Sequence, residues 1–302
     1  MEQAEEVPVD AEQQEEAEDS EEEIAAPTLI KAPQEPTAAE VEEHEATGHV
    51  QYRSWCAACV AARAYGQAHR ATPEEEETAV PTISSDYAFM GQDDGKCLPM
   101  LCMKDRKTKR VACTFVETKG ANPYGVRFYS EFVKSTGYRQ IVNKSDGEHA
   151  LVALKTKAVQ ECPGVEAQPK ETPVDDHAAN GEIESGVREL KKQVRVMKIS
   201  LESKLKMKLE EKDPVLAWLP RHAADLICRY RKGSDGKTPE QRRSGKAWRK
   251  PAIQFAERIF FREAGQRSHK NALQPVMQEG RYVGHHSRTG ALLAITPDGL
   301  KR

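Results

Sequence analysis

Short apolar runs and helical patterns alternate through the middle of the chain, and together they predict its elements. Two windows with helical spacing of apolar residues predict helices at 124–136 and 148–161. Runs rich in β-branched and other apolar residues, bounded by turn signals, predict strands. These runs cover residues 82–91, 98–105, 110–118 and 138–146. Three strands, a helix, a strand and a helix predict a mixed α/β domain.

A long amphipathic helix is predicted after this domain. Residues 166–180 are polar and contain prolines, so they predict a loop, and the helix begins near Gly181. Its apolar residues recur at steps of three and four, which places them on one face. They are Ile183, Val187, Leu190, Val194, Met197, Leu201 and Leu205. A second helix is predicted from Asp213 to about Tyr230, with Pro214 in its first turn.

Charge is strongly segregated, although the formal net charge is only −3. Residues 1–45 carry 17 acidic side chains, one basic side chain and no aromatic residue. Such a segment buries too little apolar surface to offset the entropy of ordering, so we predict a disordered tail. Residues 187–302 carry 27 basic side chains against 12 acidic ones. From Ala252 onward, short apolar runs between basic and glycine-rich turns predict a small β-barrel or meander.

The sequence excludes several classes of protein. No stretch approaches 18 consecutive apolar residues, and the N-terminus lacks the basic-then-apolar order of a secretory signal. We therefore expect a soluble, intracellular protein without a membrane span. Seven cysteines in such a chain do not indicate a disulfide framework, so a CxxC pair is tested first as a metal site.

The first motif with chemistry is His44-x4-His49-x6-Cys56-x2-Cys59. Two imidazoles and two thiolates supply the four ligands that tetrahedral zinc takes in structural sites. The CxxC spacing lets both sulfurs reach one ion. The alternative is that the two cysteines are buried thiols with no metal.

The second motif is a set of three carboxylates in the α/β region. Asp86 lies within the first predicted strand, Asp146 ends the fourth, and Glu184 lies in the first turn of the long helix. Such carboxylates can converge at one sheet edge, where oxygen ligands suit Mg²⁺ or Mn²⁺. In the alternative interpretation, Asp146 caps a helix, Glu184 complements a helix N-terminus and Asp86 is a partly exposed strand residue.

Taken together, the two motifs resemble retroviral and long-terminal-repeat retrotransposon integrases. The trio Asp86, Asp146 and Glu184 resembles the Asp, Asp-35-Glu triad of that family, although 37 residues separate the last two here. The His/His/Cys/Cys block is similar to the family's zinc-binding N-terminal module, with a shorter spacing. The basic C-terminal end resembles the family's DNA-binding domain.

The resemblance implies a multidomain α/β protein with a ribonuclease-H-like catalytic core. Together with the composition, it predicts a disordered acidic tail, a zinc-binding module, a linker, the catalytic core, a helical basic connector and a small DNA-binding β-barrel. In the same order, their boundaries are 1–40, 41–72, 73–81, 82–212, 213–250 and 251–302.

The resemblance also implies a function, which is the joining of element DNA ends to target DNA in the nucleus by a homo-oligomer. Asp86, Asp146 and Glu184 would hold two Mg²⁺ or Mn²⁺ ions, and cleavage near the donor 3′ end would free a hydroxyl that attacks target DNA. Four cations follow Glu184 on its helical face and are candidates for DNA contact, although a solvated helix face is the usual meaning of such a stripe. They are Arg188, Lys191, Arg195 and Lys198.

Two other functions remain open. One is a catalytically inactive, retroelement-derived protein that binds nucleic acid through the zinc block and the basic end. The other is a hydrolytic nuclease on the same kind of sheet, which strand-joining products would distinguish from an integrase.

Overall fold

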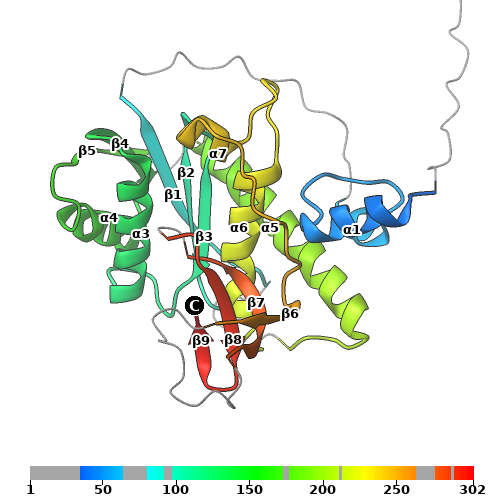
Figure 1. The fold of residues 1–302 in the computed structure, drawn as a ribbon. Helices are drawn as coiled ribbons and strands as arrows, with labels where there is room; N and C mark the ends of the chain where they lie inside the picture. Colours follow the sequence, from blue (N-terminus) through cyan, green and yellow to red (C-terminus); the bar gives the residue numbers. More distant parts are fainter. Residues whose placement is uncertain are drawn as a thin grey trace, which may run out of the picture. The chain divides into compact units, whose positions relative to one another are not determined.

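The computed structural model describes most of the chain after the acidic tail (Figure 1). These residues belong to one compact unit, Glu35–Arg302. Most of the predicted tail (1–40) and linker (73–81) lies outside the described ranges. Those ranges are 35–63, 80–91, 97–172, 177–210, 213–262, 276–286 and 289–302.

A five-stranded mixed sheet forms the centre of the unit, with the spatial order β3-β2-β1-β4-β5. β2 pairs antiparallel with β1 and β3, whereas β4 pairs parallel with β1 and β5. Because β1 and β4 are parallel, their carboxyl ends lie at the same edge of the sheet. The strands are β1 (Thr82–Ala88), β2 (Met100–Asp105), β3 (Val111–Phe115), β4 (Gln140–Asp146) and β5 (Glu166–Thr172). The predicted mixed α/β class is confirmed.

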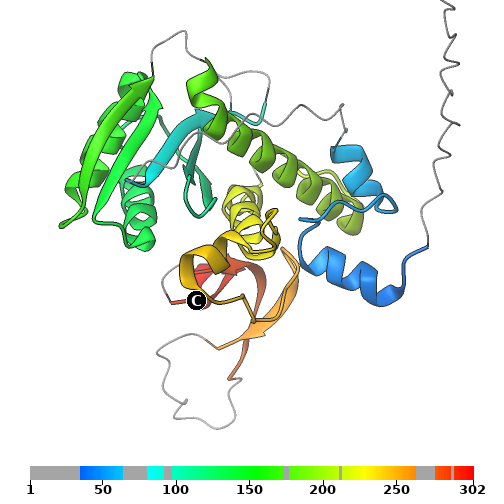
Figure 2. The same cartoon turned by 90° about the horizontal axis from the view of Figure 1, so that it is seen from above.

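Helices cover both faces of this sheet, as Figures 1 and 2 show. Successive residues of β1 face opposite sides. Ile83 and Tyr87 are buried in a core shared with α3 (Pro123–Thr136) and α4 (His149–Gln160). Ala88 belongs to a second core, shared with α5 (His177–Leu205) and α6 (Leu219–Tyr230). The alternation therefore places Asp86 on the α5 side of the sheet.

The ends of α3 follow from local sequence. The side chain of Asn122 accepts a hydrogen bond from the Gly125 N–H, and Pro123 occupies the first turn, where its missing N–H is not needed. Gly137 ends the helix with a left-handed φ of 74°, which glycine adopts without steric penalty. The predicted range 124–136 is therefore nearly the observed one.

The long helix α5 buries the predicted apolar stripe. Six of its seven apolar positions are buried, while Leu205, the last helical residue, is 45% exposed. The helix begins at His177, earlier than the predicted start at Gly181. Within the described parts of the chain, no helix is both long enough and apolar enough to cross a lipid bilayer.

The loop predicted over 166–180 is wrong, because β5 occupies its first seven residues. This strand has few of the β-branched and aromatic residues that mark strands in sequence, and it contains Pro169. It lies at the end of the strand order and pairs with β4 on one side. A proline is tolerated there, because an edge strand does not need every N–H for pairing.

The second helix starts later than predicted. A short 3-10 helix, Leu216–Trp218, precedes α6, and the proline in the first turn of α6 is Pro220, not Pro214. A short helix, α7 (Pro239–Ser244), follows, with Thr238 and Gln241 forming a capping box.

The C-terminal segment forms a four-stranded antiparallel sheet with the order β6-β7-β8-β9. Within the described residues no pairing joins β6 to β9, so the predicted barrel is not confirmed. The strands are β6 (Arg258–Phe261), β7 (Gln278–His285), β8 (Leu292–Thr296) and β9 (Gly299–Lys301).

A buried histidine joins α6 to this second sheet. His222 is 1% exposed, and its ring centre lies 5.5 Å from that of Tyr282 on β7 and 5.1 Å from that of Phe255. Neither ring nitrogen has a hydrogen-bond partner among the described residues. Burial therefore lowers the pKa of His222 to about 3, and the ring is neutral in the folded protein at neutral pH.

We predict that His222 makes the protein less stable in mild acid. Its pKa is lower in the folded state than the ordinary value of 6.5. Its contribution is therefore complete above pH 6.5 and is lost as pH falls, because only the unfolded state binds the proton. Between pH 7.5 and 5.5, His222→Leu should lose about 1 kcal/mol less free energy of unfolding than the wild type, as measured by urea denaturation. Equal losses in the two proteins, or the same reduction in the exposed-residue control His149→Leu, would contradict this.

Candidate functional site

The predicted zinc ligands lie together. The Nε2 atom of His44 and the Nδ1 atom of His49 are 2.9 Å apart, and each lies 3.4 Å from a cysteine sulfur, that of Cys59 and Cys56 respectively. All four ligand atoms lie within 4.8 Å of one another. Zinc–nitrogen and zinc–sulfur bonds of about 2.0 and 2.3 Å place tetrahedral ligand atoms about 3.3–3.8 Å apart. The cluster therefore fits a structural zinc ion after small movements.

A tight turn brings the two histidines together. His44 lies in the last turn of α1 (Ala38–Ala46), and the N–H of His49 donates to the His44 carbonyl at 3.0 Å. Gly48 has a φ of 67°, and a Cβ there would lie 2.1 Å from Leu226 Cδ1. Glycine is needed at this position for both reasons. The cysteines flank the start of α2 (Ala57–Ala62), with Cys56 as its N-cap and Cys59 within it.

Contacts outside the cluster fix the histidine rings. His49 Nε2 lies 2.8 Å from the Ser200 hydroxyl of α5, which leaves Nδ1 facing the cluster. Arg63 donates to the His49 carbonyl at 2.6 Å and to Gln193 of α5 at 2.7 Å. Trp55 packs edge-on against His44, with ring centres 5.0 Å apart. Such outer contacts orient metal ligands, and here they also tie the cluster to α5. Figure 2 shows the segment that carries the cluster beside this helix.

Burial sets the protonation of the cluster. It lowers the pKa values of His44 and His49 to about 4, so both rings are neutral at pH 7, which is the form that binds metal. Burial raises the pKa of the Cys59 thiol to about 11, so the thiolate needs a nearby cation. Metal binding should therefore be coupled to proton release.

The predicted carboxylates divide between two neighbouring strands and the long helix. Asp86 lies near the end of β1, and Asp146 is the last residue of β4. Ser84 pairs with Lys144 in the parallel register, and the same offset of 60 residues relates Asp86 to Asp146. Glu184 is exposed on α5, about two turns after the start of the helix instead of in its first turn.

Burial and the neighbouring carboxylates raise the pKa of Asp86 to about 6. Burial is the largest cause, the charge of Asp146 follows, and Glu148 and Glu184 add smaller increases. All three carboxylates therefore lie within electrostatic reach of Asp86. In the parts of the chain that the structure describes, however, only the His/Cys cluster brings three or more ligand atoms within metal-binding distance. The metal-binding role of the carboxylate trio remains a prediction.

Glu148 is the acidic neighbour that the sequence interpretation missed. It is the N-cap residue of α4, and its N–H donates to Asp146 Oδ1 at 3.4 Å. The available signal was its place two residues after Asp146, in the turn between the fourth strand and the next helix.

The four cations that follow Glu184 differ in their surroundings. Arg195 donates to the Ala62 carbonyl at 3.4 Å, and Lys198 forms an ion pair with Glu202. Arg188 and Lys191 form no ion pair or hydrogen bond with any residue in the described ranges. Arg188 is exposed and Lys191 is partly buried.

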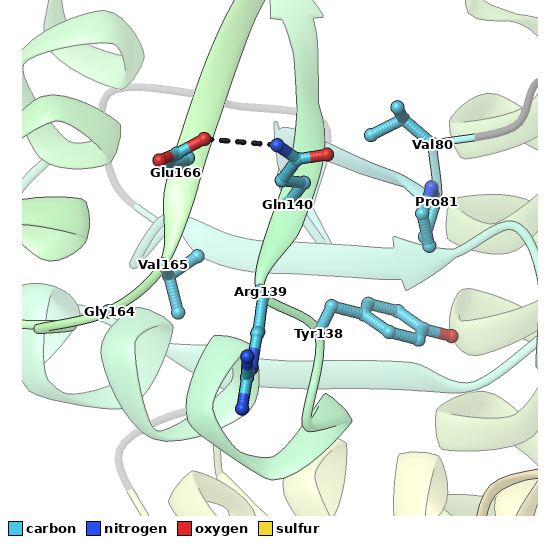
Figure 3. A pocket seen from close by; sticks show the side chains of 8 residues that line it. All are labelled: Val80, Pro81, Tyr138, Arg139, Gln140, Gly164, Val165 and Glu166. Atoms are coloured by element: carbon cyan, nitrogen blue, oxygen red, sulfur yellow. Dashed lines mark hydrogen bonds between the residues drawn. The ribbon is translucent and has the colours of Figure 1, made fainter.

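A hollow of about 760 Å³ lies at the other end of the central sheet (Figure 3). It lies where β4 and β5 begin, and there Gln140 donates to Glu166 at 3.1 Å. Tyr138 and Arg139 also line it. Asp146 is at the opposite end of β4, so this hollow contains none of the predicted site residues.

We predict that the protein binds one zinc ion per chain and that Cys59→Ser loses it. Without the zinc ion, Cys59→Ser should lose about 3 kcal/mol of unfolding free energy, which would lower its Tm by roughly 5–10 °C. Elemental analysis and thermal unfolding measure both effects. The control is Cys97→Ser, a partly buried cysteine outside the cluster. Full zinc content in Cys59→Ser would refute the assignment.

We predict that Asp86→Asn stabilises the metal-free protein. The pKa of Asp86 is raised in the folded state, so its contribution is favourable in acid and is lost as pH rises through about 6. At pH 7.5 the variant should gain on the order of 2 kcal/mol in unfolding free energy. Mn²⁺ should stabilise the wild type more than the variant. Asp298→Asn, on an exposed turn, is the control, and an unchanged stability of Asp86→Asn would contradict the prediction.

Three solved structures with integrase-related descriptions are similar to this chain. The catalytic core domain of BIV integrase shares 12% identity, covers 54% of this chain and 92% of its own, and gives a TM-score of 0.38. The trimeric, magnesium-bound catalytic core domain of HTLV-2 integrase shares 10% identity, with 54% and 95% coverage and a TM-score of 0.36. A chain of the simian T-cell lymphotropic virus intasome in complex with PP2A regulatory subunit B56 gamma shares 13% identity. The match covers 72% of this chain and 76% of that chain, with a TM-score of 0.36.

No protein-family model matches the sequence, and no curated protein matches it. The predicted His/His/Cys/Cys cluster is present among the described residues.

Proposed function

We propose that this protein is an integrase-like DNA-strand transferase that processes and joins retroelement DNA ends to target DNA. The observation that carries the proposal is the position of Asp86 and Asp146 at the carboxyl ends of adjacent parallel strands, on the face covered by α5. The raised pKa of Asp86 supports it, because carboxylates within reach of one another favour a bound cation.

The residues have separate roles in this proposal. Asp86, Asp146 and Glu184 would hold two Mg²⁺ or Mn²⁺ ions, which when bound activate an attacking oxygen and stabilise a leaving one. The chain itself would align the donor and target phosphates in line for displacement. The His/Cys cluster would bind zinc and fix α1 and α2 against α5.

The partners follow from the proposed reaction. Retroelement ends and target DNA would be the substrates, and the resemblance to integrases implies a homo-oligomer. A protein that acts on chromosomal DNA works in the nucleus. All four cations on α5 remain candidates for DNA contact, and Arg188 and Lys191 have no partner among the described residues that would compete with a phosphate.

A catalytically inactive, nucleic-acid-binding protein is the second candidate. The observation that favours it is that Asp86, Asp146 and Glu184 do not form a compact ligand cluster within the described residues. The zinc-like cluster and the basic C-terminal third serve this function equally well.

We predict that the purified protein joins DNA in the presence of Mn²⁺. Blunt duplexes with randomised ends serve as donors and a supercoiled plasmid as target, and junctions are detected by amplification and sequencing. Asp146→Asn should reduce joining at least about 100-fold, which corresponds to roughly 2.7 kcal/mol of transition-state stabilisation. Glu131→Gln, which changes an exposed carboxylate on α3, should join as the wild type does.

The other outcomes separate the alternatives. Nicked plasmid without junctions would indicate a hydrolytic nuclease. DNA binding without nicks or junctions would indicate the inactive binding protein. Equal joining by Asp146→Asn and the wild type would show that the site assignment is wrong.

A further inference from the structure

Lys119 is a cation at the sheet edge where Asp86, Asp146 and Glu148 lie, which we call the carboxylate edge. It lies in the loop between β3 and α3, and its Nζ atom is 2.8 Å from Glu148 Oε1. The same Nζ atom lies 5.4 Å from the ring centres of both Tyr87 and Phe89. Tyr87 follows Asp86 in β1, so the ammonium group is held beside the end of that strand.

The loop that carries Lys119 is anchored at both sides of this residue. The N–H of Gly120 donates to the Tyr87 hydroxyl at 3.0 Å, and Tyr87 is only 8% exposed. Gly120 has a φ of 98°, which favours glycine. Asn122 donates to the Thr118 carbonyl at 2.7 Å while it caps α3. The backbone on both sides of Lys119 is therefore anchored, which reduces the ordering that binding would require.

The ammonium group has capacity for a further partner. The side chain of Lys119 retains 35% exposure in the ion pair, and an ammonium has three N–H donors. Glu148 and the rings of Tyr87 and Phe89 contact only part of the ammonium group. An exposed ion pair by itself contributes at most about 1 kcal/mol to stability, so a phosphate can compete for the ammonium group at small cost.

The negative charge of the carboxylate edge opposes the binding of a phosphate, and Lys119 offsets part of it. Asp86, Asp146 and Glu148 place several negative charges together, and these repel an approaching phosphate. Contact with Lys119 offsets the charge of Glu148, the one carboxylate of this group that the sequence motif does not include. A cation at this position lowers the repulsion where a phosphodiester would meet the edge.

We propose that Lys119 contacts a backbone phosphate of nucleic acid that lies across the carboxylate edge, and that Glu148 is a positioning residue that holds it there. The inference rests on the proposed function only so far as nucleic acid binds at this edge. It does not require that the protein join strands.

The salt dependence of DNA binding tests the proposal. The full chain is titrated into a fluorescent 30-base-pair duplex of random sequence, without divalent ions, over a series of NaCl concentrations. Each phosphate contact contributes about −0.9 to the slope of log K against log [NaCl]. We expect Lys119→Gln to reduce the magnitude of this slope by about 1 and to weaken binding several-fold at low salt. Lys119→Arg should retain the wild-type slope.

The matched control is Lys157→Gln, which removes the same charge from an exposed site in the last turn of α4. It should leave the slope unchanged. The proposal is overturned if Lys119→Gln keeps the wild-type slope, or if Lys157→Gln lowers it equally. Thermal unfolding confirms that each variant is folded. If Lys119→Gln is not folded, the comparison uses Lys119→Met.

This result is independent of the joining assay. A reduced slope in Lys119→Gln with no joining by the wild type would support the phosphate contact and refute the strand transferase. Joining by the wild type with an unchanged slope in Lys119→Gln would support the strand transferase and refute the phosphate contact.

Discussion

The parallel pairing of β1 with β4 is the constraint on which the candidate site depends. Antiparallel neighbours would send their carboxyl ends to opposite edges, whereas this pairing brings Asp86 and Asp146 to the same one. The arrangement has an electrostatic consequence, because Asp86 is partly buried beside other carboxylates and its pKa rises to about 6. Carboxylates whose ionisation is unfavourable are stabilised by a bound cation. The parallel strand pairing therefore creates the electrostatic condition that the proposed metal binding would relieve.

The helix α5 links this edge to the His/Cys cluster. Glu184 lies toward one end of it. Further along, Ser200 contacts His49 of the cluster, and Gln193 accepts from Arg63, which also donates to the His49 carbonyl. The 16 residues from Glu184 to Ser200 span about 24 Å of helix. Since α5 also buries its apolar face on the sheet, it has little freedom to rotate. Order in the His/Cys cluster therefore constrains the helix that presents Glu184, even though the cluster takes no part in the proposed reaction.

The sequence predicted those features that local pattern determines. The first four strands of the central sheet, the buried stripe of α5 and the His/Cys cluster follow from periodicity, turn residues and ligand spacing. β5 was missed because an edge strand held by backbone pairing with β4 needs no apolar alternation. Lys119 was missed for another reason. Its partner Glu148 is 29 residues away, and only the folded sheet brings the two together. The domain boundaries and the catalytic role of the trio remain predictions.

The same distinction applies to the basic surface. A stripe of cations on a helical projection says nothing about which of them are already paired, and the structure pairs Arg195 and Lys198 within the protein. Arg188 remains on α5, on the side of the sheet that Asp86 faces. Lys119 contacts Tyr87, which faces α3 and α4. Described cations therefore lie on both sides of the sheet whose edge carries Asp86 and Asp146, and of these Lys119 contacts a carboxylate of that edge directly. A polyanion can approach such an edge if its phosphates meet cations, because those contacts offset the repulsion from the carboxylates.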